Sequence, residues 1–188
     1  MGAGPIAGPL YACAVSLRPN ALLPLVRDSK LLKARQRQDA LDSILDGAAR
    51  AWSCKSTVDL KPTIEQARLR LMMLCVVEVQ QMVEDSDTLV VVDGDLRLPL
   101  PPRYRQTALV KGDQRCLEVA CASIIAKVLR DQFMQTLAQQ HPEYGFEQNK
   151  GYATQNHIRA VLKYGLTPHH RLGACQTAIT NYLAKTGK

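Results

Sequence analysis

The amino-acid sequence predicts an α/β protein, because short apolar runs that end in aspartate alternate with long segments of helical periodicity. The run from Leu89 to Val92 is continuous and β-branched, as in a strand covered on both faces, and it ends in Asp93. A second run, Ala108 to Val110, leads through a Lys-Gly pair to Asp113. A helix is expected from there to about residue 140.

The two aspartates are the first candidates for chemistry. If their strands are neighbours in one sheet, Asp93 and Asp113 meet at its carboxyl edge, where open α/β sheets place their sites. Two close carboxylates repel each other, and a hard divalent cation bound by oxygen ligands relieves the repulsion. Asp113 has a second interpretation, because a carboxylate in the turn before a helix can cap its N–H groups. The sequence leaves both interpretations open.

The remaining elements follow from periodicity and from turn residues. Strands are expected at Leu10 to Leu17 and at Ala51 to Val58. Helices are expected at Lys33 to Ala49, at Lys61 to about Glu84, from a Thr154 cap to Tyr164, and at Cys175 to Leu183. The segment His141 to Tyr152 is expected to be a loop. Its aromatic residues beside Lys150 can stack on a base or sugar, or can simply pack the loop.

Composition bounds the class of protein. With 188 residues, 46% hydrophobic and 22% charged, the chain fits one compact domain, residues 1–188. No apolar run is long enough to span a membrane and the start lacks a basic signal-peptide region, so we expect a cytoplasmic protein. The six cysteines form no C-x-x-C pair, and Cys116 and Cys121, expected on one helix near small residues, are expected to act as small hydrophobes. The net charge of +7 favours a polyanionic partner such as nucleic acid.

The first nine residues, MGAGPIAGP, contain three glycines and two prolines. Such a backbone can approach a phosphate or a sugar closely. A flexible terminus is the alternative interpretation.

Taken together, these blocks resemble one family, the type 2 ribonucleases H in their bacterial form, ribonuclease HII. The resemblance runs from Gly2 to about Ala178 and rests on ordered motifs over most of the chain. The motifs are GAGPIAGP at 2–9, DSK at 28–30, VVDG at 91–94, VKGDQRCLEVACASIIAKVLRD at 110–131, PEYGFEQNKGY at 142–152 and HHR at 169–171.

The resemblance implies a ribonuclease H-like fold, a mixed sheet flanked by helices, with residues from about 141 to 188 forming a helical C-terminal extension. It implies endonucleolytic cutting of the RNA strand in RNA/DNA hybrids and incision at single ribonucleotides in duplex DNA, a DNA repair activity. The partners are these nucleic acids, and a monomer is expected. The implied cofactors are two Mg or Mn ions held by four carboxylates, two of which match Asp93 and Asp113.

The same resemblance assigns substrate contacts. The backbone of Gly2, Ala3 and Gly4 would lie against the 2′-OH that distinguishes RNA from DNA. Tyr152 would stack on the sugar just beyond the cut. Lys30, Lys150 and Arg171 are the candidates for phosphate contacts, expected from their charge and position.

The chain departs from the family pattern in two ways. Ala3 stands where the family usually has Arg, and the Asp-Glu pair that ends the family's first strand would fall before Met1. Two explanations are open: a start placed too late, or a short chain that has lost hydrolysis and binds hybrid or duplex nucleic acid without cutting it. We favour the first, because loss of a central strand would leave unpaired main-chain groups and an open groove in the core. That loss would cost many kcal/mol against a total stability of about 5 to 15 kcal/mol.

Overall fold

The computed structural model describes residues 1–23, 26, 32–83 and 87–187. The chain divides into two compact units. The strand unit comprises Met1 and Tyr11–Val128, and the helical unit comprises Gly2–Leu10 and Leu129–Lys188. Lys30 and Glu84 lie outside the described residues, so the expectations for them stay predictions.

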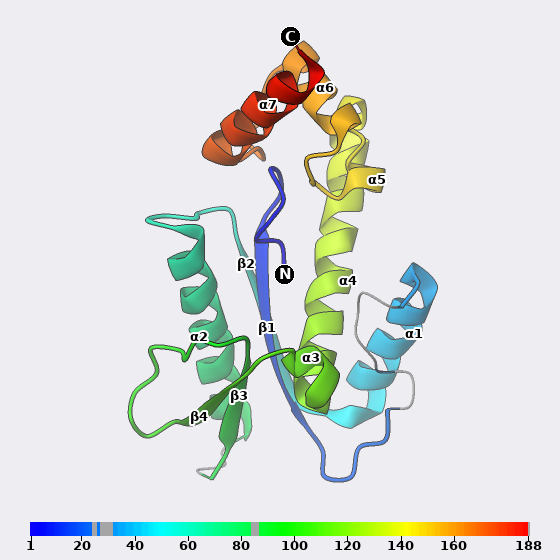
Figure 1. Cartoon of the computed structure of the whole chain (residues 1–188). Helices are drawn as coiled ribbons and strands as arrows, with labels where there is room; N and C mark the ends of the chain where they lie inside the picture. The colour runs from blue at the N-terminus through cyan, green and yellow to red at the C-terminus, as the bar shows by residue number, and fades with distance from the viewer. Residues whose placement is uncertain (24–25, 27–31, 84–86, 188) are drawn as a thin grey trace. The chain divides into compact units, whose positions relative to one another are not determined.

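The described residues of the strand unit form two sheets of two strands each (Figure 1). Strands β1 (Leu10–Leu17) and β2 (Ala49–Thr57) form one sheet, and β3 (Leu89–Asp93) and β4 (Arg105–Leu109) form the other. Strands β3 and β4 are parallel, with Asp93 opposite Leu109. The α/β class and the neighbouring arrangement of the two aspartate-bearing strands are therefore confirmed.

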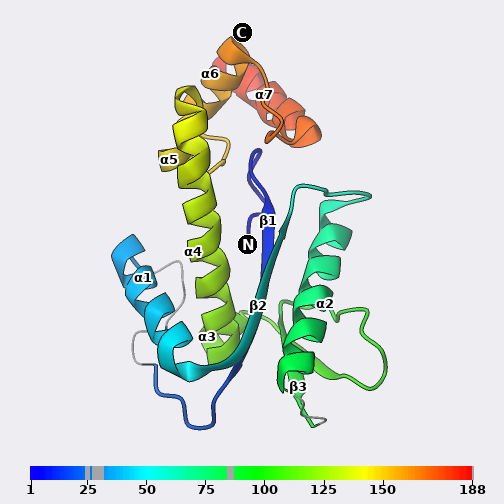
Figure 2. The same cartoon turned by 180° about the vertical axis from the view of Figure 1, so that it is seen from behind.

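Helix α2 (Ile64–Val83) supplies the apolar layer for both sheets. Its Val79 and Val83 pack with Ala51 of β2, and both views in Figures 1 and 2 place the helix alongside that strand. Towards its N-terminal half, Met72 packs against a cluster that includes Val90 and Val92 of β3. The buried side of α2 consists of Ala67, Leu71, Cys75, Val79 and Val83, whereas Leu74 is 42% exposed.

The other helices of this unit are α1 (Ala34–Ser43), a π-helical turn (Ile44–Ala48), α3 (Gly112–Arg115) and the first half of α4 (Leu117–Gln140). The single helix expected after Asp113 is wrong in one respect, because Cys116 has extended dihedral angles (φ −133°, ψ 124°) that separate α3 from α4. Asp113 consequently lies in a short helix of its own.

Two strand predictions are also corrected. Val110 was expected in the second strand, but β4 begins and ends earlier, and the Val110 side chain is 58% exposed. The run at β3 was expected to be covered on both faces, yet only Val90 and Val92 are buried, whereas Leu89 is 48% exposed. Apolar character alone therefore overestimated how far β3 is covered.

In the helical unit, the end of α4 is followed by a 3-10 turn (Pro142–Tyr144), α5 (Phe146–Asn149), α6 (Gln155–Tyr164) and α7 (Leu172–Thr186). The loop predicted for residues 141–152 is thus partly helical. Its aromatic side chains Tyr144 and Phe146 are buried with Met134, Leu137 and Val161, so they pack the segment down. The helical C-terminal part and the Thr154 cap of α6 are confirmed.

Candidate functional site

The first candidate site is the carboxyl end of the β3–β4 sheet. Asp93 is the last residue of β3, and its Oδ1 accepts a hydrogen bond from the N–H of Gly112 at 2.9 Å. Asp113 follows directly, in the first turn of α3, and its side chain is buried, with 8% exposed. The two parallel strands end side by side, with Asp93 opposite Leu109. Asp113 follows soon after the end of β4, so both carboxylates lie at the same end of the sheet.

A side chain would have little room at Gly112, between them. A Cβ at Gly112 would lie 3.3 Å from Asp93 Oδ1 and 3.1 Å from a methyl group of Val119. The preceding residue, Lys111, has a left-handed backbone (φ 55°), which turns the chain sharply from β4 into α3. The Lys-Gly-Asp break noted in the sequence is therefore a tight turn that holds Asp93 against the start of a helix.

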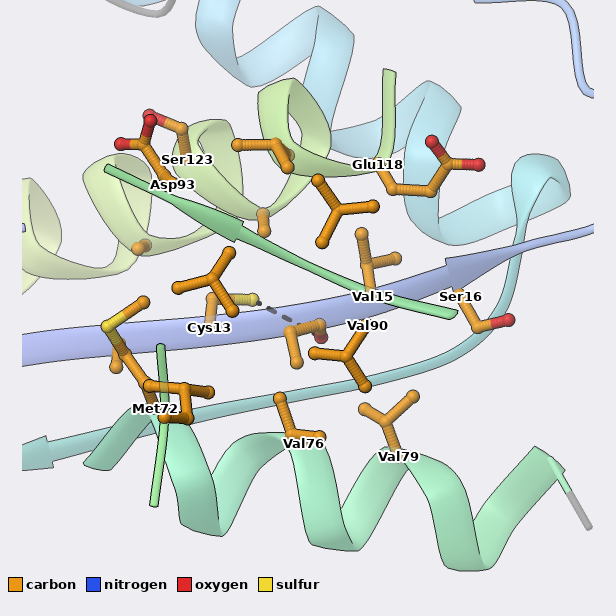
Figure 3. A pocket seen from close by; sticks show the side chains of 18 of the residues that line it. Cys13, Val15, Ser16, Met72, Val76, Val79, Val90, Asp93, Glu118 and Ser123 are labelled. Atoms are coloured by element: carbon orange, nitrogen blue, oxygen red, sulfur yellow. Dashed lines mark hydrogen bonds between the residues drawn. The ribbon is translucent and has the colours of Figure 1, made fainter. Parts of the chain in front are cut away.

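A cavity of about 530 Å³, here called the central cavity, opens beside these carboxylates. Its walls come from β1, α2, β3 and the start of α4, and Asp93 and Asp113 both line it. Figure 3 shows Asp93 at its wall. Most of the wall is apolar, including Cys13, Val15, Met72, Val76, Val79 and Val90. In the part of the chain that the structure describes, no strand pairing joins β1 to β3 across it.

Two further polar groups of the strand unit line the central cavity and were not singled out from the sequence. Glu118, in the first turn of α4, contributes a third carboxylate to its wall. Arg68 of α2 also lines it, and the Nε atom of Arg68 is buried without a hydrogen-bond partner. No local signal marks Glu118, because its place depends on how α4 packs.

The donor chemistry of this site suits a hard divalent cation, since Asp93 and Asp113 offer carboxylate oxygens. The number of donors falls short. Among the residues that the structure describes, no group of three or more His, Cys, Asp or Glu is placed to hold a metal ion. The residues present therefore fit part of a metal site.

The cysteines carry no sign of nucleophilic or metal-binding use. All six are free thiols. Burial raises the pKa of Cys121 to about 12 and that of Cys75 to about 11, which keeps both protonated at neutral pH. For Cys121 this agrees with the predicted behaviour as a small hydrophobe, whereas Cys116 lies between α3 and α4 and not on one helix with it.

The second candidate site lies within the helical unit, where residues 2–9 form a folded segment, here called the glycine loop. Ile6 and Ala7 donate their N–H groups to the carbonyl of Gly151, and Gly8 donates to that of His169. Ile6 and Ala7 are buried, whereas Ala3 and Gly4 are exposed. The loop is therefore a folded part of the helical unit, and the alternative interpretation of residues 1–9 as a flexible terminus is wrong.

Three predicted substrate contacts, Tyr152, Lys150 and Arg171, gather around this loop. A Cβ at Gly4 would lie 3.8 Å from a ring carbon of Tyr152, whose side chain is 45% exposed, so the aromatic ring flanks the loop. Lys150 has a left-handed backbone (φ 48°), and its carbonyl accepts a hydrogen bond from the guanidinium of Arg130. Arg171 directs its guanidinium at loop carbonyls. Of the predicted phosphate contacts, only Lys30 falls outside the described residues.

Histidines form a second polar cluster in the helical unit. His157 Nδ1 lies 2.8 Å from the carbonyl of Tyr152, which can only accept, so this nitrogen carries the proton. Its Nε2, 3.0 Å from Nε2 of His170, must then accept from His170. The N–H of Thr167 donates to Nδ1 of His170 at 3.0 Å and completes a chain of neutral imidazoles.

Comparisons with known proteins agree on one family. Residues 1–177 match the family model described as Ribonuclease HII. A Ribonuclease HII of Halalkalibacterium halodurans is 40% identical over 174 residues, which cover 91% of this chain and 63% of the relative. One from Cereibacter sphaeroides is 38% identical over 174 residues, covering 91% and 79%.

Solved structures support the fold. The structure titled as the PCNA:RNase HII complex from Archaeoglobus fulgidus matches with a TM-score of 0.70 at 22% identity, over 92% of this chain and 89% of that one. The ribonuclease H2 from Pyrococcus horikoshii matches with a TM-score of 0.65 at 20% identity, over 97% and 95%. The predicted ribonuclease H-like fold is confirmed.

Proposed function

Because the chain belongs to the ribonuclease HII family, we propose that it serves as an endoribonuclease that cuts the RNA strand of RNA/DNA hybrids and incises duplex DNA at embedded ribonucleotides. The proposal is carried by one observation: Asp93 and Asp113 line the same cavity at the carboxyl end of a parallel strand pair. That is where α/β sheets place their sites.

Asp93 and Asp113 are assigned as metal ligands. Mg or Mn ions bound there would supply activation of a water molecule and stabilisation of the leaving 3′ oxygen. Asp93 is exposed at the strand end, where it would hold an ion, and the hydrogen bond from the Gly112 N–H fixes its Oδ1. Asp113 is buried and would hold its oxygens in a fixed direction.

Two carboxylates alone bind such ions weakly, so the complete site needs further ligands. The resemblance implies an Asp-Glu pair at the end of a strand placed before the glycine loop. The central cavity supports a strand at this place, because it separates β1 from β3, has apolar walls and reaches both aspartates. A strand there would pair with both open edges and carry its terminal carboxylates towards Asp93.

A comparison of three proteins tests this function. The chain as printed is compared with versions extended at the N-terminus by an apolar strand ending in Asp-Glu or in Asn-Gln. We expect Mg-dependent cutting of a hybrid only from the Asp-Glu version, and loss of that cutting when Asp113→Asn is added. The Asn-Gln version controls for the effect of the strand on folding. Robust Mg-dependent cutting by the printed chain would overturn the four-carboxylate account.

Substrate recognition is assigned to the glycine loop and Tyr152. The exposed residues Ala3 and Gly4 present main-chain groups to a 2′-OH, and the ring of Tyr152 beside Gly4 supplies a surface for the sugar. Ala3 replaces the arginine usual in the family, so this contact relies on backbone groups here. A monomeric state and a cytoplasmic location remain predictions.

A second function is favoured by the shortage of metal ligands in the described residues. The chain as printed would then bind hybrid or duplex nucleic acid without cutting it, using its net charge of +7. Binding measured without divalent metal should weaken steeply with salt, since each neutralised phosphate releases counterions. Salt-sensitive binding with no cleavage by any of the three proteins would favour this function over the enzyme.

A further inference from the structure

The guanidinium group of Arg171 donates all of its hydrogen bonds to carbonyls of the glycine loop. A guanidinium has five N–H donors. Nε donates to the carbonyl of Gly8 at 3.1 Å, Nη1 to those of Ala3 at 3.2 Å and Pro5 at 2.9 Å, and Nη2 to those of Gly2 at 2.8 Å and Gly8 at 2.6 Å. No donor is left for the phosphate contact that was expected from charge alone.

A second arginine, Arg130 of α4, holds the same loop from the helix side. It is 1% exposed, and it donates to the carbonyls of Ala7, Pro9 and Lys150. Burial, and then the charge of Arg130, lowers the pKa of Arg171 to about 10, so the guanidinium group of Arg171 stays charged at neutral pH. A buried arginine and a half-buried one are thus both solvated by the carbonyl oxygens of one short loop.

The direction of these bonds determines what the loop can offer a ligand. Because the arginines take the carbonyl oxygens of their loop partners, including that of Ala3, the main-chain groups that remain at the exposed residues Ala3 and Gly4 are two N–H donors and the carbonyl of Gly4. The N–H groups of Ala3 and Gly4 make no hydrogen bond to any residue that the structure describes, and both residues are exposed. Pro5 and Pro9 have no N–H, and the N–H groups of residues 6–8 are already used inside the unit.

We propose that Arg171 is a positioning residue for ribonucleotide recognition: by holding the loop carbonyls, it keeps the N–H groups of Ala3 and Gly4 available to the ribose 2′-oxygen. This rests on the proposed function. It assigns to Arg171 an indirect role in discriminating RNA from DNA, in place of a phosphate contact. A lysine cannot reproduce it, because an ammonium group lacks the planar fork that reaches several carbonyls together.

Equilibrium binding without divalent metal tests the assignment. Two duplexes are compared, one of DNA containing a single ribonucleotide and one entirely of DNA, over a range of salt concentrations. The proteins are the unmodified chain, Arg171→Lys, and Arg159→Lys as control. Arg159 lies on α6 and bonds the hydroxyl of Tyr182, away from the loop contacts. Both substitutions keep the charge, so a change in preference reports geometry.

We expect Arg171→Lys to reduce the preference for the ribonucleotide duplex about tenfold, the equivalent of one well-placed hydrogen bond. Its salt dependence should equal that of the unmodified chain, and Arg159→Lys should change neither quantity. A uniform loss on both duplexes, with a salt slope lower by about one, would instead establish a phosphate contact and overturn the proposal.

Hydrogen exchange separates this proposal from the proposed function. Arg171→Lys should speed exchange at the Gly8 amide, which is bonded to His169, while amides in the middle of α7 keep their rates. Unchanged exchange at Gly8 would overturn the positioning role. If the unmodified chain shows no preference for the ribonucleotide duplex, the recognition function fails, and faster exchange at Gly8 would still establish that Arg171 orders the loop.

Discussion

At the scale of single residues, Gly151 is the glycine of the helical unit with the least room for a side chain. Its φ is +84°, and a Cβ there would overlap the carbonyl oxygen of Ala7. The Gly151 carbonyl also accepts from Ile6 and Ala7 at 2.9 and 3.2 Å. The glycine therefore allows the segment before Tyr152 to lie directly against the glycine loop.

Gly151→Ala should lower the free energy of unfolding by about 3 kcal/mol or more, from backbone strain and displacement of Ala7. Gly165→Ala is the matched control, because Gly165 has the same φ of +84° and nothing within 4 Å of the added Cβ. It should cost about 1 kcal/mol. Urea denaturation measures both, and equal losses would show that the close approach to Ala7 has no energetic weight.

The histidine pair gives a residue-scale prediction on pH. Burial, and then the neighbouring His157, lowers the pKa of His170 to about 4, and burial also lowers that of His157. A second proton on His157 would set two N–H donors against each other across the 3.0 Å contact, and one on His170 would face the N–H of Thr167. The neutral pair therefore stabilises the folded protein above pH 6.5, the ordinary histidine pKa, and this stabilisation is lost as pH falls towards 4.

An NMR titration should place the His170 ring well below pH 6.5. In urea denaturation at pH 7 and pH 4.5, the unmodified chain should lose on the order of 2 kcal/mol from this pair. His170→Asn should lose less over the same range, since it removes the coupled group. A His170 ring that titrates near 6.5 would contradict the neutral hydrogen-bonded chain.

At the scale of elements, residues in the turns between helices determine where each helix begins and ends. Thr154 begins α6 with an extended backbone, and its hydroxyl accepts from the N–H of His157. The cap was recognised from sequence because it depends on one residue and the next three. The break at Cys116 was missed, since nothing in its neighbours interrupts helical periodicity.

Thr154→Ala should lower the free energy of unfolding by about 1 kcal/mol, the typical value of an N-cap. Thr177→Ala provides the control: its hydroxyl bonds the carbonyl of Gly173 within α7 and is exposed, so alanine there should cost nothing and can add helix propensity. Circular dichroism during urea denaturation measures both. An equal response at the two sites would show that the cap makes no special contribution.

At the scale of the whole molecule, each unit contributes a different part of the proposed activity. The strand unit carries Asp93 and Asp113 beside the central cavity, and the helical unit carries the glycine loop with Tyr152. None of the helices that the structure describes is long and apolar enough to cross a membrane. The division also accounts for the early position of the loop, which belongs with α6 and α7 although it comes first in the chain.

The sequence by itself determined the α/β class, the parallel pair that brings Asp93 and Asp113 to one edge, and the cap of α6. These depend on short-range pattern: strand periodicity, turn glycines and a single capping hydroxyl. Only the tertiary structure decided that Arg171 contacts a loop 163 to 169 residues earlier, that Glu118 reaches the central cavity, and that β3 is covered incompletely. Such contacts depend on packing between distant segments, and the charge or hydrophobicity of one residue carries no information about its distant partner.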